Sequence, residues 1–234
     1  MEYRTLLQEE FDEIKSRILY EDNHILIINK RIGEIVQGDK TGDEPLSETL
    51  KAFIAQRDNK PGQVFMGVPH RIDRPVSGIA MFAKTSKALE RLNESFKYGE
   101  IHKTYWALTG VKPKEDEGEL VHYLVRNVKQ NKSYPYAEPR YDSKEAILRY
   151  KVIKTTDRYF LIEVDLITGR HHQVRCQLAA IGCPIKGDLK YGAPRSNKDG
   201  GISLHARSVN FIHPTRNEEI TVVAPVDWSP IVKE

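Results

Sequence analysis

A stretch of 24 residues, AILRYKVIKTTDRYFLIEVDLITG at 146–169, constrains the fold most strongly. Apolar and polar residues alternate along both halves, and a polar turn, Thr156-Asp157-Arg158, separates them. Alternation is typical of a half-buried strand, and two such runs about a short polar turn predict an antiparallel hairpin. Because strands joined by hairpins build antiparallel sheets, this stretch argues against a doubly wound parallel sheet.

Other segments repeat the strand pattern with few helices between them. ILYEDNHILIINK contains two short apolar runs around an Asp22-Asn23 turn. Further strands are predicted at 64–68, 78–83, 102–110, 202–214 and 218–226. The chain is therefore predicted to be an α+β protein with a mixed, mainly antiparallel sheet flanked by helices.

Helical spacing of apolar residues predicts helices within 1–17, 46–57, 86–98 and 170–181. Ser47 is a candidate N-cap of the second helix, and Gly99 is a natural stop for the third. We find no strong internal boundary after residue 18. The predicted organisation is an N-terminal helical extension, 1–17, followed by one domain, 18–234.

Amino-acid composition excludes few classes of protein. The 234 residues contain 36 basic and 33 acidic side chains, a net charge of +3, which neither requires nor excludes a nucleic-acid partner. The charged start is unlike a secretory signal, and apolar runs such as ILII at 25–28 are too short to span a bilayer. The two cysteines, Cys176 and Cys183, lack zinc-site spacing, so we expect a cytoplasmic protein with reduced thiols.

The first candidate site is HRIDRPVSGI at 70–79, which places Asp73 between Arg71 and Arg74 at a turn before a strand. Nearby positive charge keeps a carboxylate ionised, and an ionised carboxylate in a dry site is a candidate nucleophile or general base. The two arginines could equally bind phosphate. The alternative is an exposed cluster of ion pairs, which contributes little stability.

The second candidate is LITGRHHQVRCQLA at 166–179, where a strand ends and a helix begins. Helix N-termini bind anions, and His171 and Arg175 would share one helical face. Arg175 would lie at the core edge and need a carboxylate partner. The alternative is a basic surface helix. Metal binding is not expected, because adjacent His171 and His172 would point apart on a helix and no third ligand has suitable spacing.

Two further segments carry aromatic residues. On the strand HKTYWALTG, Tyr105 and Trp106 face opposite sides, so one packs in the core while the other could stack on a ligand, unless both only pack on the sheet. Residues 126–151 interleave seven basic residues with tyrosines, among them Tyr134, Tyr136 and Tyr141. That mixture suits a nucleic-acid surface, although a solvated loop is equally compatible.

Together these motifs resemble those of the RluA family of RNA pseudouridine synthases. HRIDRPVSGI is similar to the family's H-R-L-D-x-x-T-S-G-L, KTYWALTG to its K-x-Y-x-A, and LITGRHHQVRCQLAAIGCPIKGDLKYG to its third motif. The resemblance covers residues 18 to about 225. It implies a catalytic domain with a central RNA-binding cleft that isomerises uridine to pseudouridine in structured RNA, either ribosomal or transfer RNA, with no cofactor and no metal.

The resemblance also implies roles for individual residues. Asp73 matches the essential aspartate, Tyr105 the tyrosine that stacks on the flipped uracil, and Arg175 the arginine that pairs with the catalytic carboxylate. Arg71 matches the residue that helps displace the target base. Further RNA contacts are expected at His70, Arg74, Arg170 and His172.

Some positions depart from the family pattern. Val76 stands where the family usually has threonine, and Ile72 and Ile79 replace leucine. Residues 1–17 are too short for the S4-type domain of several relatives, so we expect the catalytic domain itself, with its basic 126–151 segment, to select the target. The protein is also expected to be a monomer. The competing hypotheses are an RNA-binding or RNA-folding protein on the same scaffold, and an unrelated phosphate-ester enzyme using Asp73 and Arg175. No Gly-rich phosphate loop or metal-binding carboxylate set supports the latter.

Overall fold

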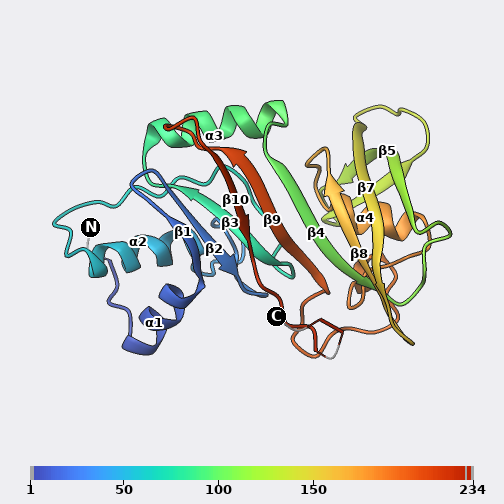
Figure 1. Ribbon diagram of the computed structural model, residues 1–234, viewed down its shortest axis with the longest axis horizontal. Coiled ribbons are helices and arrows are strands. Elements are labelled where there is room, and N and C mark those ends of the chain that lie inside the picture. The colour runs from blue at the N-terminus through green and yellow to red at the C-terminus, as the bar shows by residue number, and fades with distance from the viewer. Residues whose placement is uncertain (1–2, 230, 233–234) are drawn as a thin grey trace. The chain divides into compact units, whose positions relative to one another are not determined.

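The computed structural model describes residues 3–229 and 231–232, and the chain forms two compact units (Figure 1). The first unit comprises residues 1–101 and 209–225, and the second comprises residues 102–208 and 226–234. The long strand β9 (Leu204–Ile212) begins in the second unit and ends in the first. The predicted division between 1–17 and 18–234 stays a prediction, although a helix, α1 (Gln8–Arg17), does occupy most of the segment before residue 18.

The first unit is built on an antiparallel set of strands. β1 (Ile18–Glu21) pairs with β2 (Ile25–Lys30), and β2 pairs with β3 (Ser77–Ala83). The Asp22-Asn23 turn forms as predicted, because Asp22 Oδ1 accepts hydrogen bonds from the His24 and Ile25 amides at 2.7 and 2.9 Å. The last strand of the chain, β10 (Glu219–Val223), pairs with β9.

Two helices complete this unit beside α1, and two local predictions for it were wrong. α3 (Ser86–Tyr98) ends at Gly99, whose φ of 73° is accessible to glycine. α2 (Leu46–Arg57) starts one residue before Ser47, so Ser47 is buried inside the helix instead of capping it. Residues 64–68 form no strand, only an isolated bridge between Gly67 and Ala83.

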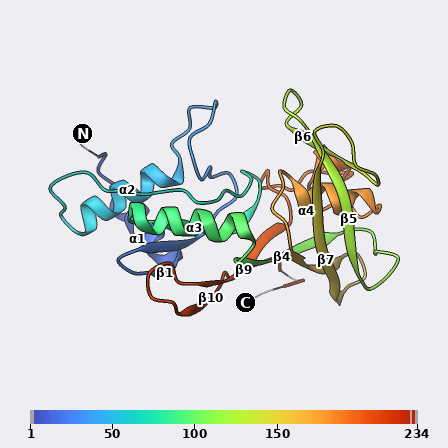
Figure 2. The ribbon, with the colours of Figure 1, turned by 90° about the horizontal axis from the view of Figure 1, so that it is seen from above.

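The second unit is a meander of antiparallel strands. Their order is β4 (His102–Thr109), β8 (Phe160–Leu166), β7 (Lys144–Thr155), β5 (Glu117–Asn127) and β6 (Lys132–Tyr136). The predicted 146–169 hairpin is β7 and β8. The basic segment 126–151, for which a solvated loop was one interpretation, instead contains the end of β5, all of β6 and most of β7 (Figure 2).

One helix, α4 (Gln173–Ala180), covers one face of this sheet, and a short helix, η1 (Leu189–Tyr191), follows it. Cys176 of α4 packs with Leu124 of β5 and Ala146 of β7 in a buried cluster. The opposite face, at β4 and β8, packs Leu108 and Leu161 against Val226 and Val232. Each face thus buries one set of alternating side chains, as a half-buried sheet requires.

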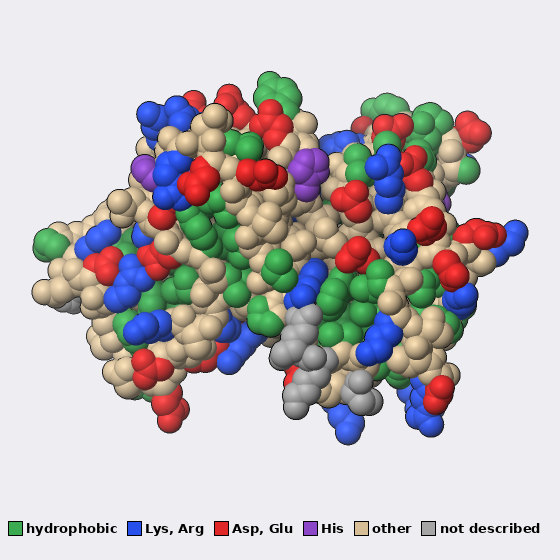
Figure 3. All heavy atoms as spheres, viewed as in Figure 1, with side chains coloured by type: hydrophobic (Ala, Val, Ile, Leu, Met, Phe, Trp, Pro, Cys, Tyr) green, Lys and Arg blue, Asp and Glu red, His purple; other side chains and the backbone are tan. Residues whose placement is uncertain are grey.

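The predicted α+β class with a mainly antiparallel sheet is confirmed. Over the described residues, every helix is too short or too polar to cross a bilayer. On the face in Figure 3, acidic and basic side chains are interspersed, in keeping with the small net charge.

Candidate active site

The loop that carries Asp73 is anchored on both sides of the carboxylate. The Val76 amide donates to the Asp73 carbonyl at 3.0 Å, and the Gly33 amide donates to the Arg74 carbonyl at 2.9 Å. Ile72 and Val76 are buried, with 8% and 2% exposure, while Asp73 between them is half-buried. The valine in place of threonine therefore fills the core beneath the loop with apolar surface.

A buried lysine lies next to this loop. Lys30, at the end of β2, is 1% exposed, and its Nζ donates to the carbonyls of Arg31, Glu34 and Arg74 at 2.8, 2.8 and 3.3 Å. Burial lowers the pKa of Lys30 to about 8, against the opposing pull of the Glu34 and Asp73 carboxylates. Lys30 thus places a positive charge within electrostatic reach of Asp73. Sequence reasoning missed this lysine.

The three other predicted site residues of this loop, His70, Arg71 and Arg74, differ from one another in burial and in partners. His70 Nε2 accepts a hydrogen bond from the Met81 amide at 2.9 Å, and its ring stacks on Phe96 at 4.8 Å between centroids. Arg74 is exposed and forms an ion pair with Asp43. Arg71 is exposed. His70 therefore joins the loop to β3, whereas the two arginines lie at the surface.

Strand register decides which way the aromatic pair of β4 points. Tyr105 pairs with Val164, which pairs in turn with Tyr150 of β7. Tyr150 lies four residues from Ala146, which packs against α4, so Tyr105 projects from the same sheet face as α4. Trp106 projects from the other face, where its Nε1 donates to Glu163 at 3.1 Å and Arg207 lies over its ring.

Arg175 is buried and has a carboxylate partner within its own unit. Its Nε and Nη2 donate to the two oxygens of Asp188 at 2.7 and 2.9 Å, and the two side chains are only 6% and 1% exposed. Tyr191 lies under the guanidinium, with 5.2 Å from its ring centroid to Cζ. The prediction that Arg175 needs a carboxylate is met by Asp188. The prediction that it also pairs with Asp73 stays a prediction.

The turn that leads into α4 differs from the helical arrangement predicted for its two histidines. His172 has a left-handed φ of 54° and lies just outside the helix, so His171 precedes the first turn and does not share a helical face with Arg175. The two imidazole rings stack at 3.8 Å instead of pointing apart. His172 is buried, with Nδ1 3.0 Å from the hydroxyl of Tyr191.

Gln173, which sequence reasoning also missed, holds this turn in place. Its buried side-chain oxygen accepts from the Thr168 hydroxyl at 2.8 Å and from the Arg170 amide at 2.9 Å, while its Nε2 donates to the Ile147 carbonyl at 3.1 Å. Arg170 is exposed, and its Nε donates to the Glu145 carbonyl at 2.8 Å. The amide side chain therefore fixes the path of the chain between β8 and Arg175.

The predicted site residues thus fall into two groups. His70, Arg71, Asp73 and Arg74 share one loop of the first unit, and Tyr105, Arg170, His172 and Arg175 lie in the second unit. Asp188 and Tyr191 belong to the quoted stretch GDLKYG, so the third motif contained the signal for them. Among the described residues, no group of three His, Cys, Asp or Glu side chains is arranged to hold a metal.

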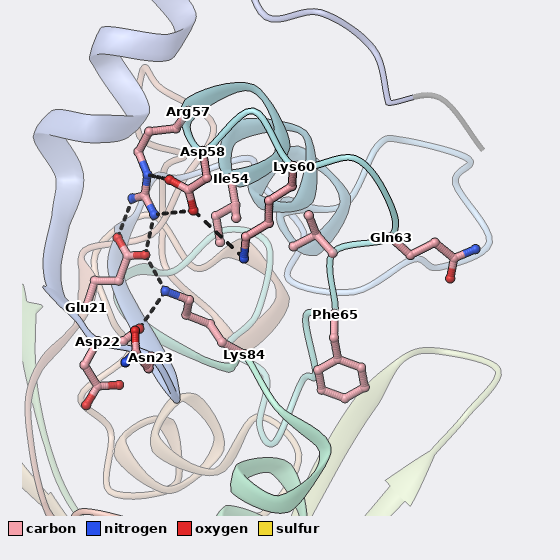
Figure 4. A pocket seen from close by; sticks show the side chains of 11 residues that line it. Glu21, Asp22, Asn23, Ile54, Arg57, Asp58, Lys60, Gln63, Phe65 and Lys84 are labelled. Carbon is pink, nitrogen blue, oxygen red and sulfur yellow. Dashed lines mark hydrogen bonds and ion pairs between the residues drawn. The ribbon is translucent and has the colours of Figure 1, made fainter.

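A pocket of about 660 Å³ in the first unit contains none of these residues (Figure 4). Its wall is an ion-pair network in which Arg57 binds Glu21 at 2.7 Å and Lys84 binds Glu21 at 2.6 Å. Lys84 also donates to the Asp22 carbonyl at 2.6 Å. These charges are neutralised by one another, which indicates a structural role.

Comparison with known proteins identifies the class of this chain. The sequence model of the RNA pseudouridylate synthase family matches residues 24–180. Ribosomal large subunit pseudouridine synthase C of Buchnera aphidicola is 33% identical over 219 residues, covering 90% of this chain and 67% of the relative. tRNA pseudouridine synthase C of Vibrio parahaemolyticus is 29% identical over 235 residues, covering 92% of each chain.

The fold agrees with these sequence matches. The structure of human RNA Pseudouridylate Synthase Domain Containing 4 superposes with a TM-score of 0.77 at 23% identity, covering 93% of this chain and 91% of that one. The chain spans about two thirds of the ribosomal relative's length and nearly all of the tRNA relative's length. On the strength of the family match, this chain belongs to the RNA pseudouridylate synthases, a family of isomerases.

Proposed function

We propose that this protein converts specific uridines in structured RNA to pseudouridine, with Asp73 as the essential carboxylate. The observation that carries the proposal is the Asp73 loop itself, which matches the family motif and is tied down on either side of a half-buried carboxylate. In this reaction the N1–C1′ bond of the nucleotide breaks and a C5–C1′ bond forms. C5 then loses its proton and N1 gains one, so the atoms balance without an oxidant or reductant.

The proposed reaction places cationic side chains near the Asp73 carboxylate. Lys30 is one of them, because its ammonium lies within electrostatic reach of Asp73. Arg175 is proposed to be another. Asp188 holds Nε and Nη2 of Arg175 in a fixed plane, so the guanidinium would meet the Asp73 carboxylate already oriented. Asp73 is proposed to act at the sugar C1′ or at the base.

Tyr105 is proposed to stack on the extruded uracil and to assist removal of the C5 proton. Its position on the α4 side of β4 supports this role, because Arg175 belongs to the helix on the same face. The alternative aromatic, Trp106, is engaged by Glu163 and Arg207 on the opposite face. Tyr105 is proposed as the ligand-stacking ring because it shares the α4 face of the sheet with Arg175.

The RNA contacts are proposed at exposed cationic side chains near the loop and near the start of α4. Arg71 would help displace the target base, and Arg74 and Arg170 would bind backbone phosphates. His70 and His172 were predicted as RNA contacts too. Their hydrogen bonds to the Met81 amide and to the Tyr191 hydroxyl favour a role in positioning the surrounding chain.

Ribosomal RNA and transfer RNA are both candidate substrates. The names of two relatives include one of each, a ribosomal large subunit enzyme and a tRNA enzyme. The protein is proposed to act as a cytoplasmic monomer without metal or cofactor. Mapping pseudouridine across total RNA from cells with and without this gene product would choose between the two RNA classes.

The decisive variant is Asp73→Asn, assayed by tritium release from transcripts containing 5-tritiated uridine. We expect loss of tritium release with RNA affinity kept within a few fold, because the substitution keeps the shape and removes the charge. Asp157→Asn, at an exposed position in the β7–β8 turn, is the matched control and should behave as wild type. Tritium release at the wild-type rate from Asp73→Asn would refute the proposed role.

A second measurement separates an isomerase from an RNA-folding protein on the same scaffold. Tyr105→Phe keeps an aromatic face and loses the hydroxyl, so the rate of isomerisation should fall more than RNA affinity. Affinity should also decrease with salt, since phosphate contacts release counterions. An RNA-folding protein would anneal RNA equally well with Asp73→Asn and would release no tritium even as wild type.

A further inference from the structure

β5 and β6 form a hairpin (Figure 2), and the turn between them carries an exposed apolar residue, Val128. Val128 is 73% exposed, and its neighbours Lys129 and Gln130 are exposed as well. A side chain this exposed contributes little to the core, and it is available for contact with a ligand.

The charge around this turn is concentrated and of one sign. Residues 126–137 contain Arg126, Lys129 and Lys132 and no acidic residue. This short segment carries as much positive charge as the whole chain does in net terms, which is +3. Lys190 of η1 adds a fourth cation beside it, with its Nζ 3.2 and 3.0 Å from the carbonyls of Gln130 and Asn131. Such a concentration attracts a polyanion.

The turn is also held rigidly, which separates it from an ordinary solvated loop. The Gln130 amide donates to Asn127 Oδ1 at 3.0 Å, and the Asn131 amide donates to the Val128 carbonyl at 3.2 Å. The Tyr134 hydroxyl donates to Gln130 Oε1 at 2.5 Å. A tip that is ordered before binding loses little conformational entropy when it contacts a ligand.

The same turn is connected to the chain that leads into α4. Ser133, buried behind the tip, has its hydroxyl 2.9 Å from His171 Nδ1 and donates to the His171 carbonyl at 2.7 Å. His171 Nε2 lies 3.1 Å from Asn131 Oδ1. Val128 and Lys129 therefore hold a set position relative to Arg175, four residues after His171. His171 occupies the variable position of the third motif, so this link is a property of this chain.

We propose that the β5–β6 turn binds the helical stem next to the target uridine, with Lys129 on a backbone phosphate and Val128 against the riboses of the shallow minor groove. The proposal rests on the proposed function, because it specifies where the substrate RNA lies. The rigid turn would then fix the distance between a stem and the reacting nucleotide, which is a means of choosing among uridines.

A helical stem fits this tip better than stacked single-stranded bases. Base stacking needs an aromatic or guanidinium plane, and valine offers neither. The nearby aromatic rings are engaged: Lys132 lies over Tyr134 at 5.4 Å, and Arg140 lies over Tyr136 at 4.2 Å. The minor groove of A-form RNA is wide and shallow and exposes riboses, so a small apolar tip can enter it.

The test is steady-state tritium release on the shortest stem-loop of transcribed ribosomal or transfer RNA that the wild-type protein modifies. Lys129→Ala and Val128→Asp should raise KM about three- to tenfold with kcat unchanged, and Lys129→Ala should lower the salt slope by about one. The matched controls are Lys114→Ala and Val111→Asp. These exposed residues precede β5, whose 11 residues separate them from the tip by roughly 33 Å.

Tethered cleavage locates the RNA element that the tip touches. Cys176 and Cys183 are each 1% exposed, so Val128→Cys provides a single reactive thiol for an iron chelate that generates hydroxyl radicals. We expect cleavage on both strands of the stem, and none from the control Val111→Cys. The inference would be overturned if cleavage were confined to loop nucleotides, or if Lys129→Ala and Val128→Asp had the same KM as their controls. The proposed function would still stand in that case, provided that the wild-type protein releases tritium. Absence of wild-type release would instead refute the proposed function.

Discussion

Replacing Lys30 with methionine tests how the first unit holds its reactive loop. Methionine fills similar volume but leaves the carbonyls of Arg31 and Glu34 without the lysine donor, whereas the Arg74 carbonyl keeps its bond from the Gly33 amide. An unsatisfied buried acceptor costs about 1–3 kcal/mol, or roughly 2–6 kcal/mol for these two carbonyls. The substitution also removes the cost of burying a charge, which is about 3 kcal/mol at pH 7. This cost follows from the pKa of Lys30, which is about 8 in the folded protein and 10.5 in the unfolded chain. We expect a net loss of about 1 kcal/mol in the free energy of unfolding at pH 7.

The pH dependence gives the prediction a definite sign. Between pH 8 and 10.5 the unfolded lysine binds more protons than the folded one, so Lys30 makes the free energy of unfolding rise with pH. From pH 7 to pH 9 the wild type should gain about 1 kcal/mol relative to Lys30→Met, which lacks the titrating group. The difference between the two proteins should therefore widen with pH.

The assay is urea unfolding at both pH values, followed by far-ultraviolet circular dichroism. Both tryptophans, Trp106 and Trp228, lie in the second unit, so fluorescence would report on the wrong part of the chain. Lys40→Met, at an exposed position of the first unit, is the control and should match wild type at each pH. If the difference between wild type and Lys30→Met stayed constant from pH 7 to pH 9, the buried-ammonium reasoning would be refuted.

Three further variants test other buried or strained positions. Asp188→Asn should destabilise the second unit by about 3–5 kcal/mol in urea unfolding followed by tryptophan fluorescence, because it removes the buried carboxylate charge that two nitrogens of the Arg175 guanidinium bind. Burial lowers the pKa of His213, so wild-type stability should fall as pH drops below 6.5, and His213→Gln should flatten that acid limb of a thermal-melt series. Gly99→Ala should cost about 1 kcal/mol in thermal unfolding because of its positive φ, whereas Gly38→Ala, with open space around it, should cost less.

Much of the architecture follows from local patterns in the sequence. Alternation predicted the hairpin of β7 and β8, and a glycine stop predicted the end of α3. Alternation failed for β5 and β6, because basic side chains at the exposed positions resemble a solvated loop and β6 contains Pro135. Only pairing with β7 on one side of β5 and with β6 on the other makes these residues a sheet.

The first residue of α4 could not be predicted from the spacing of apolar residues alone. Helical spacing placed His171 in the helix, but the left-handed φ of His172 moves the start to Gln173. A non-glycine residue adopts that conformation only when its surroundings compensate. Here the Gln173 side chain bonds to Thr168 and Arg170 just before it and to Ile147 on β7, and the contact with β7 comes from tertiary structure that no spacing rule encodes.

For the candidate site, the sequence predicted which chemical groups are needed but not which residues supply them. The sequence required a carboxylate for a core-edge Arg175, and the structure supplies one from Asp188, 13 residues along the chain. For Asp73 the sequence offered flanking arginines, but Arg74 binds Asp43, and one buried charge within electrostatic reach of Asp73 is Lys30. Lysines are rarely buried, so no composition rule would have placed one there.

Lys30 and Asp188 share a feature that bears on why such residues are present. Each is a buried charge, 1% exposed, that holds a proposed reactive segment, the Asp73 loop or the Arg175 guanidinium. Buried charges are costly, and apolar replacements of a complete buried ion pair are often more stable. If stability alone decided, Arg175 and Asp188 could both be apolar. Their joint replacement by Met and Leu should then retain or raise stability in urea unfolding while abolishing tritium release, a separation expected only if the pair serves the reaction.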